Sequence, residues 1–435
     1  MMFLALVVPY SYFNHSAGWN QTARLAELHA IVLQGTVRID AYHEITGDKA
    51  VIDGHYYSEK APVIVAAALP PFALTVMAQR IAGVDPDAPS GWRVSEWITT
   101  AACVGVLAAL GGVAFFALTA SRLGTEVALL STFGVFLGTL TFPYATTLFA
   151  HAGTIGLVAV ALWAVLDTVS PSRARDFIGG LAAGFAVASE YPAALACAVL
   201  ALYLASVSWQ RLWRFGLATL PAVGLILVNN YLISGSPFQL SYGSNPLFPE
   251  MTTGNWMGFW LPDLRLTPSL LWSEYRGLMF WSPILLLAVP GIVQLYRADR
   301  SIAMMIIAAC VLTFLEVAAF YNWSGGNSFG PRYLSPAVPF IGLAAGYGIR
   351  RFPEMGLVLS VISIGLMLMV TSIAIDPPGD VLTPLQSFYW VRIQQDRFAD
   401  NLGTLLGAPV WVSLIAPMLV PAVVARKLLK EPVSG

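Results

Sequence analysis

Long apolar runs recur along almost the whole chain, and no other feature restricts its possible folds as strongly. Most of them are about long enough to cross the hydrocarbon core of a bilayer, which is roughly 30 Å thick. Charged residues make up 11% of the 435 residues, whereas soluble domains contain about 25%. We therefore expect an all-α polytopic membrane protein, a single integral membrane domain over residues 1–435, with about 12 transmembrane helices. The expected spans are 2–13, 97–119, 124–142, 152–168, 177–189, 191–207, 214–232, 281–297, 301–320, 335–349, 355–375 and 408–425.

Basic residues concentrate in the short connectors on one side of these spans. Examples are the pair Arg173 and Arg175 and the pair Arg350 and Arg351. Because Lys and Arg in short loops resist translocation, we expect this side, and both termini, to lie in the cytoplasm. The inner side then carries 12 Lys and Arg against 6 Asp and Glu, and the acid-rich outer side carries 11 against 18. The outer side holds four longer segments, residues 14–96, 233–280, 321–334 and 376–407.

The first outer segment contains an apolar stretch, residues 61–82, that either crosses the membrane or lies at its outer face. If it crossed, the later basic connectors would face outward unless residues 177–207 formed a single span. Placing it outside, as a helix or a re-entrant hairpin, keeps every basic connector in the cytoplasm. Its prolines, Pro62, Pro70 and Pro71, also favour this placement because proline breaks helices.

An amphipathic helix is expected earlier in the same segment, over residues 20–35. Apolar residues such as Leu25 and Leu28 fall on one helical face, with Asn20 as the expected N-cap and Gly35 as the expected end. Such a helix is typical of the membrane interface.

Acidic and basic side chains cluster where this segment meets its apolar stretch. Asp40, Asp48 and Asp53 lie close together in sequence, followed by Lys60. A carboxylate can act as a general base on an acceptor hydroxyl, and a lysine can bind phosphate as a point charge. The alternative is a solvated loop in which these carboxylates pair with nearby basic residues.

Other outer segments add candidate residues. The sequence "YNWSGGNSFGPRYLSP" combines glycines, which allow close approach of backbone to a ligand, with Arg332, whose guanidinium suits phosphate. The alternative interpretation of this segment is a glycine-rich turn anchored by one arginine. His151 is a further candidate, although a single histidine is often structural. The candidates for an acceptor or sugar pocket are Asn20, Arg24, Asp53, His55, His151, Glu190, Glu274, Arg276, Trp323 and Tyr333.

The motifs "YYSEKAP" and "GPRY", together with a long first outer loop, resemble the GT-C superfamily of polytopic glycosyltransferases. Within it, the chain is similar to protein O-mannosyltransferases and lipid A aminoarabinose transferases. The resemblance implies a polyprenyl-phosphate-sugar donor used on the extracytoplasmic face, and an inverting direct displacement onto an acceptor hydroxyl. It also implies that Lys60 contacts the donor phosphate, and we expect Arg332 and Tyr57 to share that site.

One departure from the family concerns its catalytic acid. Aligning "NQTARLAEL" with the corresponding family helix places Asn20 at the acid position, and an amide is not a useful base. Similar bacterial proteins carry a pattern that fits Asp48 and the following "GHYYS". We therefore expect Asp48 to be the base, with Asp40 as second choice.

The expected partners are the polyprenyl-phosphate-linked donor, a lipid, glycan or protein acceptor, and membrane lipids. The net charge of −1 gives no indication of nucleic acid. No cofactor is expected, although three carboxylates could hold a divalent cation. Two other classes stay open, a non-catalytic lipid-binding protein of the same fold and a secondary transporter, although we find no internal repeat typical of transporters. The sequence does not identify the sugar, the acceptor or the polyprenyl length.

Overall fold

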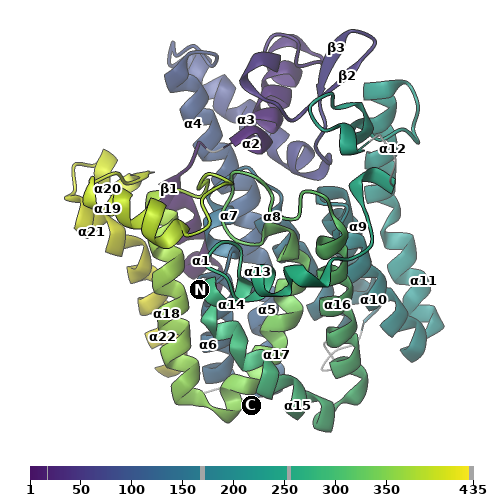
Figure 1. Cartoon of the computed structure of the whole chain (residues 1–435), viewed down its shortest axis with the longest axis vertical. Helices are drawn as coiled ribbons and strands as arrows, with labels where there is room; N and C mark the ends of the chain where they lie inside the picture. The colour runs from purple at the N-terminus through teal and green to yellow at the C-terminus, as the bar shows by residue number, and fades with distance from the viewer. Residues whose placement is uncertain (17, 167–171, 252–255, 431–435) are drawn as a thin grey trace.

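A computed structural model describes residues 1–16, 18–166, 172–251 and 256–430. It is mostly helical, with a bundle of roughly parallel and antiparallel helices and a smaller layer of elements at one end (Figure 1). In the described part, six helices are long and apolar enough to cross a membrane: Val63–Ile81, Pro89–Leu123, Trp209–Ser234, Arg300–Ala319, Pro353–Ile373 and Val410–Lys430. Shorter apolar helices accompany them, and the chain is a multi-pass membrane protein.

The bundle helices follow the expected apolar runs closely. They are α1 (Met2–Tyr12), α5 (Val106–Leu123), α6 (Thr125–Phe136), α8 (His151–Leu166), α9 (Arg173–Ser189), α10 (Ala193–Val207), α11 (Trp209–Ala218), α12 (Leu220–Ser234), α15 (Ala288–Ala298), α16 (Arg300–Ala319), α17 (Val338–Arg351), α18 (Pro353–Ile373) and α22 (Leu419–Lys430). The expected run 124–142 breaks into α6 and a short α7 (Thr141–Ala145). The end of the run 152–168 lies outside the described residues, as do residues 252–255 of the outer segment 233–280. The number of helices that cross a membrane stays a prediction.

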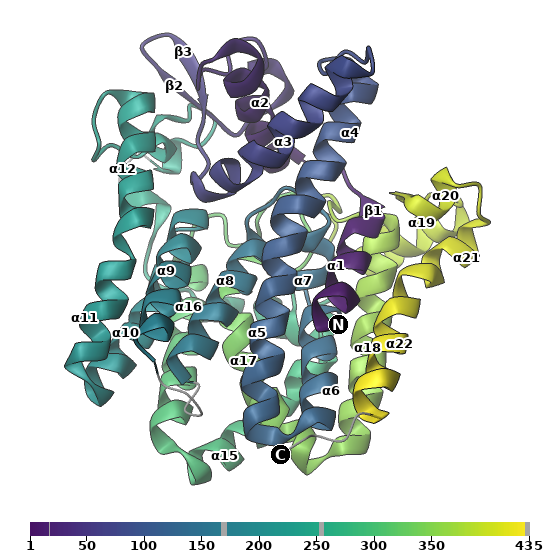
Figure 2. The same ribbon diagram turned by 180° about the vertical axis from the view of Figure 1, so that it is seen from behind.

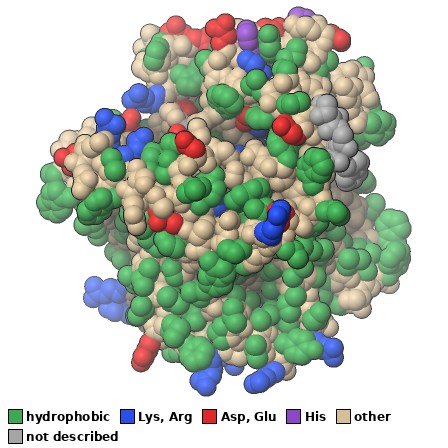
Figure 3. All heavy atoms as spheres, in the orientation of Figure 1, with side chains coloured by type: hydrophobic (Ala, Val, Ile, Leu, Met, Phe, Trp, Pro, Cys, Tyr) green, Lys and Arg blue, Asp and Glu red, His purple; other side chains and the backbone are tan. Residues whose placement is uncertain are grey.

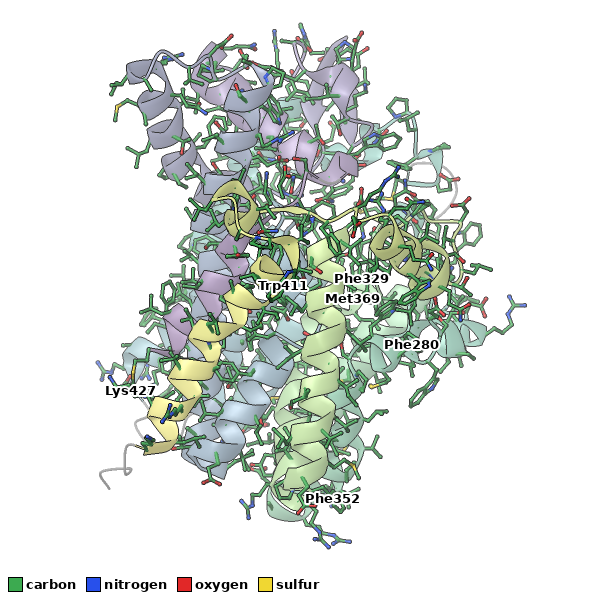
Figure 4. The ribbon with its side chains drawn as sticks, turned by 90° about the vertical axis from the view of Figure 1, so that its left-hand side faces the viewer. Phe280, Phe329, Phe352, Met369, Trp411 and Lys427 are labelled. Atoms are coloured by element: carbon green, nitrogen blue, oxygen red, sulfur yellow. The ribbon has the colours of Figure 1, made fainter. Side chains whose placement is uncertain are left out.

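Short elements complete the described chain. Two-residue strands β1 (Phe13–Asn14) and β4 (Asp400–Asn401) pair antiparallel, which joins the end of α1 to the last outer segment. Short helices are α13 (Thr267–Leu271), α14 (Leu278–Trp281), α19 (Val391–Gln394), α20 (Leu402–Leu405) and α21 (Val410–Ile415). Figure 4 follows α22 from the region of Trp411 down to Lys427, at the end of the bundle where Phe352 also lies.

Small residues let the central helices approach closely. A Cβ on Gly111 of α5 would lie 2.2 Å from the Cα of Gly156 in α8, and one on Gly291 of α15 would lie 1.8 Å from the carbonyl oxygen of Ala344 in α17. Inside a membrane, helices gain little from burying apolar surface against each other, so close van der Waals contact between small residues holds them together. A polar N-cap begins α16, where the side chain of Asp299 accepts a hydrogen bond from the N–H of Ile302.

The layer at one end contains α2 (Gly18–His29), the hairpin of β2 (Lys49–Ile52) and β3 (His55–Ser58), α3 (Val63–Ile81) and α4 (Pro89–Thr100) (Figures 1 and 2). The expected helix 20–35 is α2 followed by a π turn, Ala30–Gln34. Gly35 ends it with φ +69°, as expected, but the helix begins at Gly18, so the prediction that Asn20 caps it is wrong. Its apolar side chains pack into the protein core.

Helix α3 lies within the apolar stretch 61–82, whose position the sequence left open. It begins at the edge of the bundle and runs away from it. Helix α4, a π turn and α5 form one 35-residue helix, Pro89–Leu123. Its part from Leu123 to Cys103 is about 30 Å long at 1.5 Å per residue. Near its beginning α3 meets Cys103, whose Sγ contacts the carbonyl oxygen of Ile64, and near its end Gln79 donates a hydrogen bond to Gly91 O of α4. Helix α3 therefore lies beside α4, beyond the level of Cys103 (Figure 2).

Candidate active site

A cavity of about 280 Å³ lies between the end layer and the bundle. Its wall joins segments that are far apart in sequence, namely α2, the ends of the β2–β3 hairpin, the α9–α10 turn, the segment after α12, α16 and the glycine-rich segment after α16. Its charged and histidine side chains are Arg24, Asp48, Glu59, Lys60, His151, Glu190, Glu316 and Arg332. The remaining wall includes polar Asn20 and Asn322, several tyrosines and an apolar part.

The β hairpin brings Asp48 to Lys60. Asp53 and Gly54 form its two-residue turn, both with positive φ (51° and 79°), which is the conformation that Asp-Gly turns adopt in tight hairpins. In the resulting register Lys49 pairs with Ser58. The residues just before β2 and just after β3 therefore meet at the open end of the hairpin, which faces the cavity.

Lys60 is held there by two carboxylates. Its Nζ lies 2.7 Å from Asp48 Oδ2 and 2.8 Å from Glu59 Oε1, and all three side chains are largely buried. Burial alone would lower the pKa of Lys60, but the negative charges of Asp48 and Glu59 outweigh it and raise that pKa well above its usual value. Lys60 is therefore a permanent cation.

Glu59 is fixed in turn by the segment after α12. Its Oε2 accepts a hydrogen bond of 2.6 Å from Asn245 Nδ2, which also donates to Gly47 O at 3.1 Å. Burial raises the pKa of Glu59, against the attraction of Lys60. Tyr242 of the same segment places its ring 5.7 Å from Lys60 Nζ. This segment thus forms one wall of the cavity and orients the Lys60 cluster.

Two arginines in the wall have no carboxylate within ion-pairing distance among the described residues. Arg24 is 2% exposed and, among the described residues, donates only to Asn20, through its side-chain and backbone oxygens. Arg332 donates to Tyr333 Oη at 3.1 Å and lies over the rings of Phe149 and Tyr333. The Nε atoms of both arginines are buried without a partner among these residues. Buried guanidinium groups of this kind suit an anionic ligand.

His151 and Glu190 form a third polar group. His151 begins α8, and its Nδ1 contacts Glu190 Oε1 at the end of α9. The second oxygen of Glu190 accepts from Ser335 Oγ at 3.2 Å. His151 is 2% exposed.

Seven of the sequence-predicted residues do not line the cavity. Asp40 and His55 pair with each other at 2.8 Å in an exposed position, and Asp53 lies in the hairpin turn. Tyr57 is buried within β3. Glu274 accepts from the N–H groups of Leu385 and Gln386, in the last outer segment. The other two residues are Arg276 and Trp323.

Arg276 supports the glycine-rich segment from behind. It is 1% exposed, and its guanidinium donates to three backbone carbonyls of that segment at 2.6–2.7 Å. The three acceptors are Ser324, Gly326 and Ser328. Gly325 then lies directly against Arg332, since a Cβ on it would be 2.6 Å from Arg332 Nε. Arg276 therefore helps to place Arg332 without reaching the cavity itself.

No sequence pattern assigned Glu59, Tyr242, Asn245 or Glu316 to the site. Only Glu59 carried a signal, because it stands beside Lys60 in the "EKAP" motif. No group of three or more His, Cys, Asp and Glu in the described residues is arranged to hold a metal ion.

Comparisons with known proteins agree on the fold. No family model matches the chain, and no curated protein does. Among solved structures, ArnT from Cupriavidus metallidurans bound to undecaprenyl phosphate matches with a TM-score of 0.51 and 16% identity, over 98% of this chain and 72% of that one. The same protein in the apo state matches with a TM-score of 0.50 and 18% identity over the same shares.

Proposed function

Because the chain has a GT-C-like glycosyltransferase fold, we propose that it is a membrane glycosyltransferase that moves a sugar from a polyprenyl-phosphate donor to an acceptor hydroxyl. One observation carries the proposal: a single cavity joins Asp48 to three buried or half-buried cations, Arg24, Lys60 and Arg332. Two of these cations have no carboxylate within ion-pairing distance among the described residues. A donor phosphate would supply the missing negative charge.

Two features of the molecule support the proposal that the cavity opens at the extracytoplasmic face, namely its surface and the course of α3. Figure 3 shows a broad apolar zone over the lower part of the molecule, basic side chains at its lower edge and acidic ones mainly above. The positive-inside rule supports a cytoplasmic position for the basic end. The roughly 30 Å between Leu123 and Cys103 is similar to the thickness of the hydrocarbon core, which supports an extracytoplasmic position for α3 and the cavity.

Arg332 is the principal group for the donor phosphate. Its planar guanidinium can donate two parallel hydrogen bonds to phosphate oxygens. Lys60 contributes a second cation, since an ammonium has three donors and two of them are directed at Asp48 and Glu59. Support comes from the fold neighbour, which was solved with undecaprenyl phosphate bound.

Asp48 is the base in this proposal. It lines the cavity beside Lys60, and a carboxylate there can accept a proton from the acceptor hydroxyl. The hydroxyl oxygen attacks the anomeric carbon as the bond from that carbon to the phosphate oxygen breaks. The electron pair of that bond leaves with the polyprenyl phosphate, and Arg332 and Lys60 stabilise the added negative charge. A single displacement inverts the anomeric configuration, and the proposal needs no metal.

Substitution of Asp48 tests catalysis separately from binding. Asp48→Asn should lower turnover by about 10²–10⁴-fold, the usual contribution of a general base, and leave the affinity for undecaprenyl phosphate unchanged. Arg332→Ala should weaken that affinity. Asp40→Asn is the matched control, because Asp40 is exposed and does not line the cavity.

Two results would contradict the proposal. Equal loss of lipid binding in the Asp48 and Arg332 variants would show that Asp48 is not a base. Tight binding of undecaprenyl phosphate without sugar transfer from any polyprenyl-phosphate donor would favour the non-catalytic lipid-binding class.

A further inference from the structure

The cavity contains an imidazole–carboxylate pair that the proposed reaction leaves unused. His151 Nδ1 contacts Glu190 Oε1, and Glu190 is itself held by Ser335. Both ring nitrogens are buried, and neither makes a hydrogen bond of good geometry among the described residues; Nδ1 has the Glu190 carboxylate in contact, whereas Nε2 has no polar contact there. A buried polar atom without a partner is costly, so the free nitrogen requires an explanation.

The surroundings decide which hydrogen-bonding role Nε2 has. A neutral imidazole carries its proton on one nitrogen, and the contact of Nδ1 with a carboxylate oxygen favours the proton on Nδ1, which makes Nε2 the acceptor. Burial lowers the pKa of the ring, Glu190 favours a second proton, and the positive charges of Arg332 and Arg24 oppose it. Tyr144 meets the ring edge-on but donates its hydroxyl proton to Phe329 O. No described side chain donates to Nε2, so its donor is a ligand or a water molecule that a ligand hydroxyl can replace.

His151 lies beside the proposed phosphate site. Its ring is 5.9 Å from the centroid of Phe149 and 6.1 Å from that of Tyr333. The guanidinium of Arg332 lies over the same two rings, at 5.6 Å and 5.0 Å. A phosphate on Arg332 would thus bring the attached sugar next to His151. The hydroxyl nearest to that phosphate is the one on the carbon adjacent to the anomeric carbon.

We propose that His151, oriented by Glu190, is a hydroxyl-binding subsite that selects donor sugars with a free hydroxyl next to the anomeric carbon. The inference rests on the proposed function, because it takes the phosphate position from Arg332. The hydroxyl donates its proton to Nε2, and no bond to carbon forms or breaks at this subsite. His151 is then a specificity-determining residue.

Binding measurements on the purified full-length protein test the subsite. The probes are undecaprenyl phosphate, its glucose and mannose derivatives, and the 2-deoxyglucose derivative, which lacks the hydroxyl in question. The wild type should bind the better of the two hydroxylated donors about three- to tenfold more tightly than the 2-deoxy donor, the value of one hydrogen bond. His151→Ala should abolish this preference and leave undecaprenyl phosphate binding unchanged. His151→Gln retains an acceptor oxygen and should keep part of the preference.

The outcomes separate this inference from the proposed function. A wild type that does not discriminate against the 2-deoxy donor overturns the subsite. So does a His151→Ala variant that loses affinity for undecaprenyl phosphate itself, because the imidazole would then bind phosphate. If Arg332→Ala binds undecaprenyl phosphate normally, the proposed function fails at its phosphate site, whatever His151 does.

Discussion

Replacement of Gly325 by alanine should displace Arg332 and weaken donor binding. The added Cβ would lie 2.6 Å from Arg332 Nε, whereas ordinary contacts of a Cβ are 3.4–4 Å. The guanidinium must therefore retreat by about 1 Å, a displacement that can reduce a rate by about 100-fold when it misplaces a reacting or binding group. Gly325 also has φ +76°, where alanine costs about 1–2 kcal/mol.

Gly326 provides a matched control for that strain. It has φ +64°, and a Cβ on it would meet nothing within 4 Å. Gly325→Ala and Gly326→Ala should thus lose similar thermal stability in detergent, since both force alanine into the left-handed region. Only Gly325→Ala should bind undecaprenyl phosphate more weakly and show slower sugar transfer. Equal affinities and rates in the two variants would refute the argument that Gly325 positions Arg332.

Three further predictions concern residues around the cavity. Arg276→Met removes three hydrogen bonds to the glycine-rich segment. The variant should lose about 3–5 kcal/mol of stability and bind undecaprenyl phosphate more weakly. A stable variant with normal binding would show that the segment keeps its conformation without Arg276. Asn245→Ala leaves Glu59 Oε2 without its donor and should lower stability by about 1.5–3 kcal/mol, as unfolding of the purified protein in detergent can measure. Burial raises the pKa of Glu27 to about 7 from 4.5, so the folded protein keeps a proton that the unfolded chain releases. The stability from this group is complete below pH 4.5 and is lost as the pH rises through 7, on the order of 3 kcal/mol in total. Glu27→Gln should remove that part of the decline between pH 5 and pH 8, and an unchanged slope would contradict the assignment.

The helices could be predicted because the membrane imposes a simple rule. A segment that crosses hydrocarbon must satisfy its own backbone hydrogen bonds, so apolar length alone indicates a helix. The break of the run 124–142 into α6 and α7 was not predictable in this way. Apolar length alone also did not fix the course of α3, which meets the same length and composition criteria as the other candidate spans, although its prolines and the later basic connectors favoured an outer position. Only its contacts with Cys103 and Gly91 show that it continues beyond the end of the bundle.

The candidate site shows the same division. Local motifs pointed to Asp48 and Lys60, because the hairpin that joins them is encoded by a short turn and nearby residues. Two residues of the same type in the outer segments did not take the same position relative to the cavity. Arg276 and Arg332 both lie in outer segments. Arg276 donates its guanidinium hydrogens to backbone carbonyls, whereas Arg332 has, among the described residues, no partner for its Nε beside the cavity.

The amino-acid sequence by itself determined that this chain is a helical membrane protein, and it marked the two motifs that carry Lys60 and Arg332. The tertiary structure alone decided how the ions are paired: Asp48 meets Lys60 across the hairpin, Asn245 meets Glu59 from a distant segment, and Glu190 meets His151. The reason is physical. Helix formation depends on neighbours a few residues apart, whereas the charge balance of a buried site depends on whichever groups the packing of distant helices brings within a few ångströms.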